Sequence, residues 1–122
     1  MRRELLRAKI HRATVTMTDI EYEGSLTLDR DLMDAADLRP FEKIDVYDVE
    51  NGARFSTYVI PGEPGSGTVC VNGAAARLVT RGDRVIIAAY ASMEEHEIAG
   101  HAPKVLLVDD FNKIKREVLL EP

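Results

Sequence analysis

The sequence predicts a mainly β protein, built as one small barrel of at least six short strands with only short helices between them. Alternation of apolar and polar residues with a period of two dominates the chain, and the helical patterns are brief. The 122 residues suit a single domain, 1–122, and no repeat or linker divides them. Because several short strands in an open sheet leave exposed edges, closure into a barrel is the expected arrangement.

The first three predicted elements lie in the N-terminal third of the chain. Residues 5–16 are rich in β-branched side chains and form the first predicted strand. Residues 25–29 form the second strand, in which Leu26 and Leu28 alternate with polar residues. Residues 29–38 have helical spacing and acidic residues near the start, which suits the helix dipole. A short helix therefore follows the second strand.

A β-hairpin is the clearest local signal in the middle of the chain. Residues 43–49 and 53–60 read as strands, and they flank Asn51-Gly52, a strong hairpin turn signal. The remaining predicted elements, in order, are a buried strand at 68–71, one or two helical turns at 73–79, a central strand at 84–91, a short helix at 94–98, a strand at 104–108 and a charged, frayed tail from Asn112.

Composition excludes several classes of protein. The chain carries 16 Lys and Arg against 21 Asp and Glu, a net charge of −5, and no basic cluster offsets it, so we expect no nucleic-acid partner. No apolar run is long enough for a membrane helix, and the Arg-rich first 20 residues lack the core of a secretory signal. The single cysteine, Cys70, suits a reducing compartment, and its position between Val69 and Val71 favours a small buried residue over a nucleophile. We therefore expect a cytoplasmic protein without a membrane partner.

The chemistry-bearing residues, considered alone, support only a modest conclusion. His96 and His101 are five apart, which does not place them on one helix face, so no metal site is predicted. Ser25 lacks the glycine pattern of a hydrolase nucleophile. Lys9 and Arg54 are candidates for an anion site, although Arg54 on a strand face is more often plain barrel exterior.

A run of small residues, Asn72-Gly73-Ala74-Ala75-Ala76, follows the strand at 68–71. Small residues at a strand end let backbone N–H groups approach a ligand closely. The same run also reads as an ordinary helix start with Asn72 as its N-cap. The residues alone leave both interpretations open.

Six segments together resemble the bacterial pyruvoyl-dependent aspartate 1-decarboxylases in order and spacing, from residue 5 to about residue 113. The segments are KIHRATVT at 9–16, YEGS at 22–25, DLMDAADL at 31–38, NGARFSTY at 51–58, VNGAAA at 71–76 and GDRVIIAAYASM at 82–93. Pro64 and Arg77 depart from the family pattern. The resemblance implies a six-stranded double-psi β-barrel and a homotetramer with active sites at subunit boundaries.

The resemblance also implies that the chain cuts itself at the Gly24–Ser25 bond. The Ser25 hydroxyl would attack the Gly24 carbonyl, with Thr57 assisting by a hydrogen bond to that carbonyl. Elimination would release residues 1–24 as the β chain, and hydrolysis would leave a covalent pyruvoyl group at the start of residues 25–122, the α chain. No metal is implied. The sequence leaves open whether an activating protein is needed.

In the mature protein, the resemblance implies conversion of L-aspartate to β-alanine and CO2 through a Schiff base with the pyruvoyl group, which supplies pantothenate biosynthesis. Tyr58 would be the proton donor, and Lys9 and Arg54 would hold the substrate carboxylates. The other implied site residues are Thr57, Asn72, Gly73, Ala74 and Ala75 in the substrate pocket, with His11 and Tyr22 nearby.

Two alternatives and one geometric question accompany this hypothesis. The chain could be a non-catalytic small β-barrel that serves as a binding or interaction module, with Ser25 in an ordinary turn. A nucleic-acid-binding barrel comes third, because the net charge disfavours it. Thr57 and Tyr58 are adjacent, so a regular strand would point them to opposite faces. For both to contact one site, that strand must end, bulge or lie between two subunits.

Overall fold

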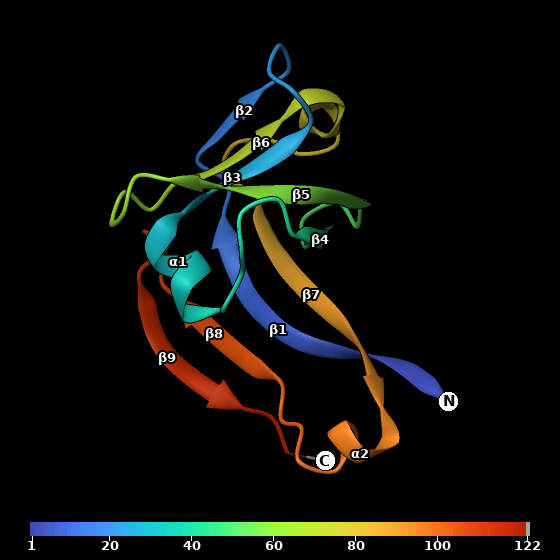
Figure 1. Cartoon of the computed structure of the whole chain (residues 1–122). Helices are drawn as coiled ribbons and strands as arrows, with labels where there is room; N and C mark the ends of the chain where they lie inside the picture. The colour runs from blue at the N-terminus through green and yellow to red at the C-terminus, as the bar shows by residue number, and fades with distance from the viewer. Residues whose placement is uncertain (122) are drawn as a thin grey trace.

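The computed structural model describes residues 1–121, which form nine β-strands, two short α-helices and one 3₁₀ helix (Figure 1). The mainly β prediction is confirmed. In chain order the elements are β1 (Arg2–Thr14), β2 (Met17–Asp19), β3 (Ser25–Asp29), α1 (Arg30–Ala35), β4 (Lys43–Asp48), β5 (Arg54–Gly62), β6 (Val69–Asn72), η1 (Gly73–Arg77), β7 (Arg84–Glu94), α2 (Glu95–Ile98), β8 (Lys104–Val108) and β9 (Ile114–Leu119).

The strands pair in the order β2-β6-β3-β5-β4-β7-β1-β8-β9. Strand β5 connects two parts of this sheet, because its first half pairs antiparallel with β4 and its second half pairs parallel with β3. In Figure 1, β2, β6 and β3 accordingly lie above β5, and the other strands lie below it. Within residues 1–121 no ladder joins β2 to β9, so the sheet is not closed and the predicted six-stranded barrel is not confirmed.

The core follows from alternation along the strands. In β4 the buried residues are Ile44, Val46 and Asp48, and the residues between them are more exposed. Strand β7 lies between β4 and β1, which confirms the prediction of a central strand. The largest fully buried side chains include Ile10, Leu26, Leu28, Leu32, Met33, Ile87 and Leu106. None of the helices within residues 1–121 is long and apolar enough to cross a membrane.

The predicted hairpin is confirmed. In the ladder between β4 and β5, Tyr47 lies opposite Arg54 at one end and Lys43 lies opposite Tyr58 at the other. Gly52 at the turn has φ +76°, a conformation that favours glycine. The helix predicted over 29–38 is shorter and ends at Ala35. Its N-cap is the buried Asp29, whose side chain accepts a hydrogen bond from the Asp31 N–H.

Two strands have no counterpart in the sequence-based prediction. Strand β2 has only three residues, which is too short to display an alternating pattern. Strand β9 occupies the tail that was expected to fray, so that expectation was wrong. Half of its residues are charged and most are exposed, yet its backbone pairs antiparallel with β8, beginning with Leu119 opposite Lys104. Backbone hydrogen bonds to a neighbouring strand, and not side-chain burial, define this edge strand.

Candidate active site

Ser25 and Asn72 lie directly opposite each other on the antiparallel strands β3 and β6. Thr27 and Cys70 are the next opposed pair on the same face, because side chains two residues apart in a strand point the same way. Asn72 Nδ2 donates hydrogen bonds to Ser25 Oγ and to Thr27 Oγ1, both at 3.0 Å. Ser25 and Asn72 are only 1 % and 3 % exposed. The two strands thus hold a buried polar cluster on one face.

The Ser25 hydroxyl is held on both sides. Its Oγ accepts from Asn72 and donates to the Glu23 carbonyl oxygen at 3.0 Å, so this second bond spans the Gly24–Ser25 peptide. A β-carbon on Gly24 would meet nothing within 4 Å, which means that one side of the peptide is open. The hydroxyl is therefore fixed beside the Gly24–Ser25 peptide bond.

The run Gly73-Ala74-Ala75 forms the start of η1, immediately after Asn72. Gly73 is buried with φ +75°, and the Gly24 backbone packs directly against it. Ala74 is exposed and Ala75 is half-buried. The predicted helical turns after Asn72 are confirmed, although the Asn72 side chain makes no capping hydrogen bond and is directed to Ser25 and Thr27.

Tyr58 is placed level with Ser25 by the parallel pairing of β3 and β5. Leu26 pairs with Val59, so the residues that precede them are neighbours across the two strands. Tyr58 is half-buried, and its ring centroid lies 6.3 Å from that of Phe41. Thr57 pairs with Ile44 in a ladder that has no register shift from residue 54 to residue 58. Thr57 and Tyr58 consequently point to opposite faces, and β5 has no bulge there.

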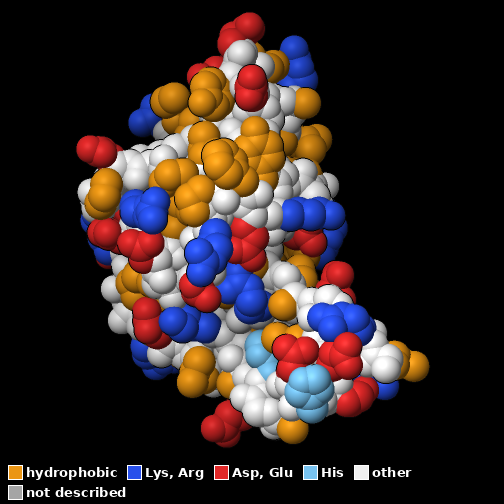
Figure 2. All heavy atoms as spheres, viewed as in Figure 1, with side chains coloured by type: hydrophobic (Ala, Val, Ile, Leu, Met, Phe, Trp, Pro, Cys, Tyr) orange, Lys and Arg blue, Asp and Glu red, His pale blue; other side chains and the backbone are white. Residues whose placement is uncertain are grey.

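A cavity of 480 Å³ lies over the Asn72 face. Tyr22 lines it and is 53 % exposed, and Asn72, Thr27 and Cys70 contribute to its floor. The other lining residues are Thr16, Met17, Asp19 and Thr68. Figure 2 shows hydrophobic side chains gathered over the part of the surface formed by β3, β5 and β6. The predicted site residues Tyr22 and Asn72 thus share one cavity.

Lys9 and Arg54 lie on a different part of the sheet. Lys9 pairs with Ala88, which pairs with Asp45, which in turn pairs with Ser56, so three strand spacings of about 4.8 Å each separate Lys9 from β5. Neither residue lines the 480 Å³ cavity. Within one chain, the structure does not bring Lys9 and Arg54 together into an anion site.

Two tyrosines support Arg54. Its guanidinium lies 4.0 Å from the centroid of the Tyr47 ring, a cation–π contact, and Tyr47 Oη is 2.8 Å from Tyr90 Oη. Burial, followed by the hydrogen bond to Tyr90, raises the pKa of Tyr47 to about 12. Among residues 1–121 Arg54 forms no salt bridge, so its charge is available to an incoming anion.

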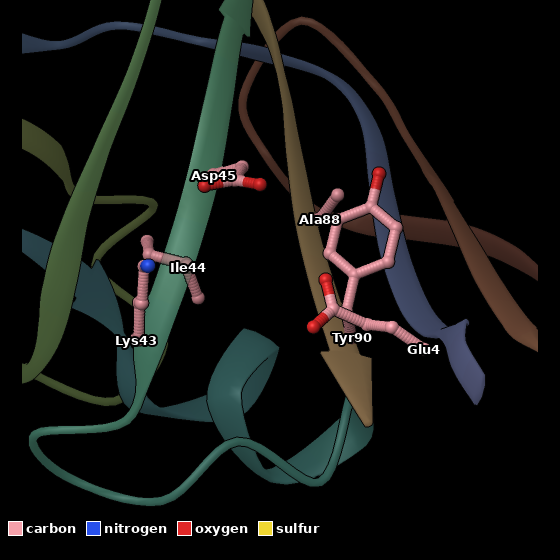
Figure 3. A pocket seen from close by; sticks show the side chains of 6 residues that line it. All are labelled: Glu4, Lys43, Ile44, Asp45, Ala88 and Tyr90. Atoms are coloured by element: carbon pink, nitrogen blue, oxygen red, sulfur yellow. The ribbon is translucent and has the colours of Figure 1, made fainter. Parts of the chain in front are cut away.

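A smaller cavity of 130 Å³ opens beside this tyrosine pair (Figure 3). Lys43 and Asp45 reach it from β4, whereas Ala88 and Tyr90 reach it from β7. Asp45 accepts a hydrogen bond from Ser56 Oγ at 2.5 Å. Carboxylates thus share this surface with the cations, and the surface is not a uniformly positive one.

His11 lies two residues from Lys9 on the same face of β1. Its Nδ1 is buried and has no hydrogen-bond partner within residues 1–121. Burial lowers the pKa of His11, and the charges of Lys9 and Arg12 lower it further, so the imidazole is neutral at neutral pH. No hydrogen bond connects it to the Ser25 cluster within those residues.

Three members of the Ser25 cluster were not among the predicted site residues. Thr27 shares the Asn72 amide with Ser25, and Glu23 provides the carbonyl that accepts from Ser25. Cys70 was predicted only as a small buried residue, and it is buried, but its Sγ also donates to Asn72 Oδ1 at 3.2 Å. The alternation of side chains along a strand could have indicated Thr27 and Cys70. Each is two residues from a predicted site residue on its own strand, so it points to the same face.

Comparison with known proteins gives a consistent result. Residues 1–115 match the family described as aspartate decarboxylase. A protein of Ralstonia nicotianae named aspartate 1-decarboxylase is 56 % identical over 94 % of this chain and 96 % of its own length. Proteins with the same name from Cupriavidus necator, 57 % identical over 94 % of the chain, and Neisseria meningitidis, 56 % identical over 100 % of it, each match over 96 % of their own length.

Proposed function

The chain belongs to the aspartate decarboxylase family, and we propose that it converts L-aspartate to β-alanine and CO2 with a pyruvoyl group that it makes from its own Ser25. The observation that carries the pyruvoyl proposal is the Ser25 hydroxyl, which is buried and held by Asn72 and Glu23 across the Gly24–Ser25 peptide. β-Alanine is the unit that this activity provides for pantothenate biosynthesis.

The surroundings of residue 25 fit a group formed there. Asn72 Nδ2 is 3.0 Å from Ser25 Oγ, so it supplies a hydrogen-bond donor within reach of residue 25. The 480 Å³ cavity over the same face provides space for a small substrate beside Asn72. Asn72 and the backbone of Gly73–Ala75 would hold the group and the substrate next to it.

Self-cleavage begins at the Ser25 hydroxyl. Its oxygen forms a bond to the Gly24 carbonyl carbon, the Gly24–Ser25 C–N bond breaks, and the nitrogen takes the hydroxyl proton, which leaves an ester. Loss of the Ser25 α-proton then breaks the ester C–O bond and releases residues 1–24 with a C-terminal carboxylate. Water finally replaces the nitrogen of residue 25, which leaves as ammonia. Because a hydroxyl is a weak nucleophile, its fixed position has to provide much of the acceleration. Thr57 is assigned the hydrogen bond to the Gly24 carbonyl.

The pyruvoyl ketone supplies an electron-accepting carbonyl that stabilises negative charge at the substrate α-carbon. Arg54 binds a substrate carboxylate through its planar fork, and Lys9 provides a second cation. Tyr58 Oη delivers a proton to the carbon that has lost its carboxylate. His11 and Tyr22 are assigned supporting positions near the substrate.

The site is completed, we infer, by a second copy of the chain in a homotetramer. Lys9 and Arg54 are separated from the Ser25 cavity within one chain, so a neighbouring copy must bring these cations to it. Large exposed apolar side chains favour such an assembly, among them Met17, Tyr22, Phe41 and Leu78. We also assign the strands to a double-psi β-barrel in one domain, processed into residues 1–24 and 25–122, and the protein to the cytoplasm.

An activity assay tests this function. Purified protein is incubated until processing stops, and β-alanine formed from L-aspartate is measured. The wild-type chain and Ser92→Ala, which alters an exposed serine of β7, are expected to form β-alanine. Ser25→Ala is expected to form none. A folded Ser25→Ala variant that is active would overturn the pyruvoyl proposal, and an inactive but fully processed wild-type chain would overturn the reaction.

A further inference from the structure

The Asn72 side chain stands at the centre of a hydrogen-bonded chain that begins at Cys70. Cys70 Sγ donates to Asn72 Oδ1 at 3.2 Å, and Asn72 Nδ2 donates to Ser25 Oγ at 3.0 Å. Ser25 Oγ then donates to the Glu23 carbonyl at 3.0 Å. Cys70 and Asn72 are 5 % and 3 % exposed, so water does not compete freely for these groups. Every bond in this chain depends on which end of the Asn72 amide faces Ser25.

Cys70 decides that orientation. The hydroxyls of Ser25 and Thr27 can each donate or accept, so they would tolerate either end of the amide. A thiol donates through its S–H, whereas its sulfur is a weak acceptor. Cys70 therefore prefers the oxygen end of Asn72, which turns Nδ2 towards the two hydroxyls. Burial raises the pKa of the Cys70 thiol, and the Asp19 charge raises it further, so the thiol keeps the proton that it donates.

The orientation of the amide determines where the Ser25 proton points. With Nδ2 facing it, Ser25 Oγ accepts from Asn72, and its own proton is directed to Glu23 O across the peptide that is to be cut. In the reversed amide, Oδ1 would compete for the Ser25 proton. The hydroxyl would then be drawn away from the Gly24–Ser25 peptide.

We propose that Cys70 is a positioning residue for self-cleavage: its thiol fixes the Asn72 amide with Nδ2 towards Ser25 and so holds the Ser25 hydroxyl beside the Gly24 carbonyl. This inference rests on the proposed self-processing of the chain. Cys70 takes part in no bond that is made or broken, and it acts only through Asn72.

The test compares three variants of the full chain with the wild type. Cys70→Ala removes the donor, and Cys70→Ser keeps a donor of similar size. Val69→Ala is the matched control, because Val69 lies on the same strand, is fully buried and belongs to the opposite face. Freshly purified precursor is incubated at one temperature, and the cleaved fraction is followed by denaturing mass spectrometry. The melting temperature of each uncleaved precursor is measured in parallel.

Cys70→Ala is expected to cleave roughly two- to tenfold more slowly than the wild type, the change in rate that the loss of one hydrogen bond produces. Cys70→Ser is expected to cleave at a rate between those of the wild type and Cys70→Ala, because its hydroxyl can still donate to Asn72 Oδ1 but can also accept, and so fixes the amide less strictly than the thiol does. Val69→Ala is expected to lower the melting temperature and leave the rate of cleavage unchanged.

The inference is overturned by any of three results. The first is a Cys70→Ala variant that cleaves as fast as the wild type, which would show that the thiol has no influence on Ser25. The second is a Cys70→Ser variant that is slowed as much as Cys70→Ala. The third is a rate of cleavage that follows the melting temperature across all three variants. Either of these would leave Cys70 with a purely structural role. In these cases the wild type still cleaves and the proposed function stands. A wild-type chain that never cleaves defeats the proposed processing, and this inference with it.

Discussion

Gly73 packs so closely against Gly24 that a β-carbon on Gly73 would lie 2.6 Å from the Gly24 α-carbon and 2.8 Å from the Gly24 nitrogen. Both contacts are to backbone atoms, which cannot swing away as a side chain can. Gly73 also has φ +75°, which disfavours any residue with a β-carbon. The start of η1 therefore forms a wall against the peptide that the chain is proposed to cut.

Gly73→Ala is expected to displace the Gly24 backbone and to slow self-cleavage by at least tenfold. Its positive φ alone costs about 1–2 kcal/mol of stability, and the contact with Gly24 adds to that. Gly100→Ala is the control, since a β-carbon there meets nothing within 4 Å. Denaturing mass spectrometry and chemical unfolding measure the two effects. Cleavage of Gly73→Ala at the wild-type rate would show that the close packing of Gly73 against Gly24 is unimportant for self-cleavage.

Tyr58→Phe is expected to separate processing from catalysis. Tyr58 lies level with Ser25, yet it is assigned only the proton transfer to the product. The variant should therefore cleave normally and form β-alanine at least 100-fold more slowly, a loss typical of removing a general acid. The fraction cleaved and kcat are measured on one preparation. A variant with unchanged kcat would remove Tyr58 from its assigned role.

Arg54→Lys keeps the charge but removes the planar fork and its stacking on Tyr47. We expect KM for L-aspartate to rise roughly tenfold, because the bidentate grip on a carboxylate is lost. Self-cleavage should be unaffected, since Arg54 is assigned only to the substrate carboxylate and has no part in the steps at Gly24 and Ser25. Arg81→Lys, which changes an exposed arginine, serves as the control. An unchanged KM would argue against Arg54 as the carboxylate ligand.

Asp48 gives the fold a specific dependence on pH. Burial raises the pKa of Asp48, and the neighbouring Asp83 carboxyl raises it further, whereas the backbone N–H groups of Glu50 and Asn51 oppose the shift. Its Oδ2 is buried without a hydrogen-bond partner within residues 1–121. The folded chain thus holds this proton more tightly than the unfolded chain does. The resulting stability is complete below the ordinary aspartate pKa of about 3.9 and is lost as pH rises through the folded pKa.

Asp48→Asn is expected to remove the loss of stability that the wild type shows as pH rises. The amide of asparagine carries no charge at any pH in this range, and it still offers an acceptor to the backbone N–H groups of Glu50 and Asn51. Relative to the wild type, the free energy of unfolding of the variant should therefore increase from about pH 4 to about pH 7. Urea unfolding at several pH values measures this difference. A difference that stays constant with pH would contradict the buried, proton-holding carboxyl.

Local signals predicted the elements better than they predicted the sheet. Asn51-Gly52 specifies its hairpin through short-range backbone preferences, and the apolar run in β7 indicates a strand with neighbours on both sides. Strand β9 could not be recognised, because edge pairing needs no apolar alternation. The predicted helix ends early at Ala35, and Asp37 just beyond it has φ +56°, a conformation that the sequence does not announce.

For the site too, the sequence indicated individual residues better than the contacts between them. The resemblance named Ser25 and Asn72, but their contact joins residues 47 positions apart, and only the register of β3 with β6 establishes it. Cys70 was interpreted as a core residue because a valine flanks it on each side, and its bond to Asn72 needs the same register. Lys9 and Arg54 were considered together because of their charge, whereas the strands between them keep them apart in one chain.

The intact mass of the purified protein under denaturing conditions tests the central claim most directly. We predict two fragments, residues 1–24 and residues 25–122, with the larger one lighter than an N-terminal serine fragment by one ammonia and reactive towards carbonyl reagents. Two outcomes would contradict the account: a single uncut chain that persists after prolonged heating, or a larger fragment that begins with an intact serine.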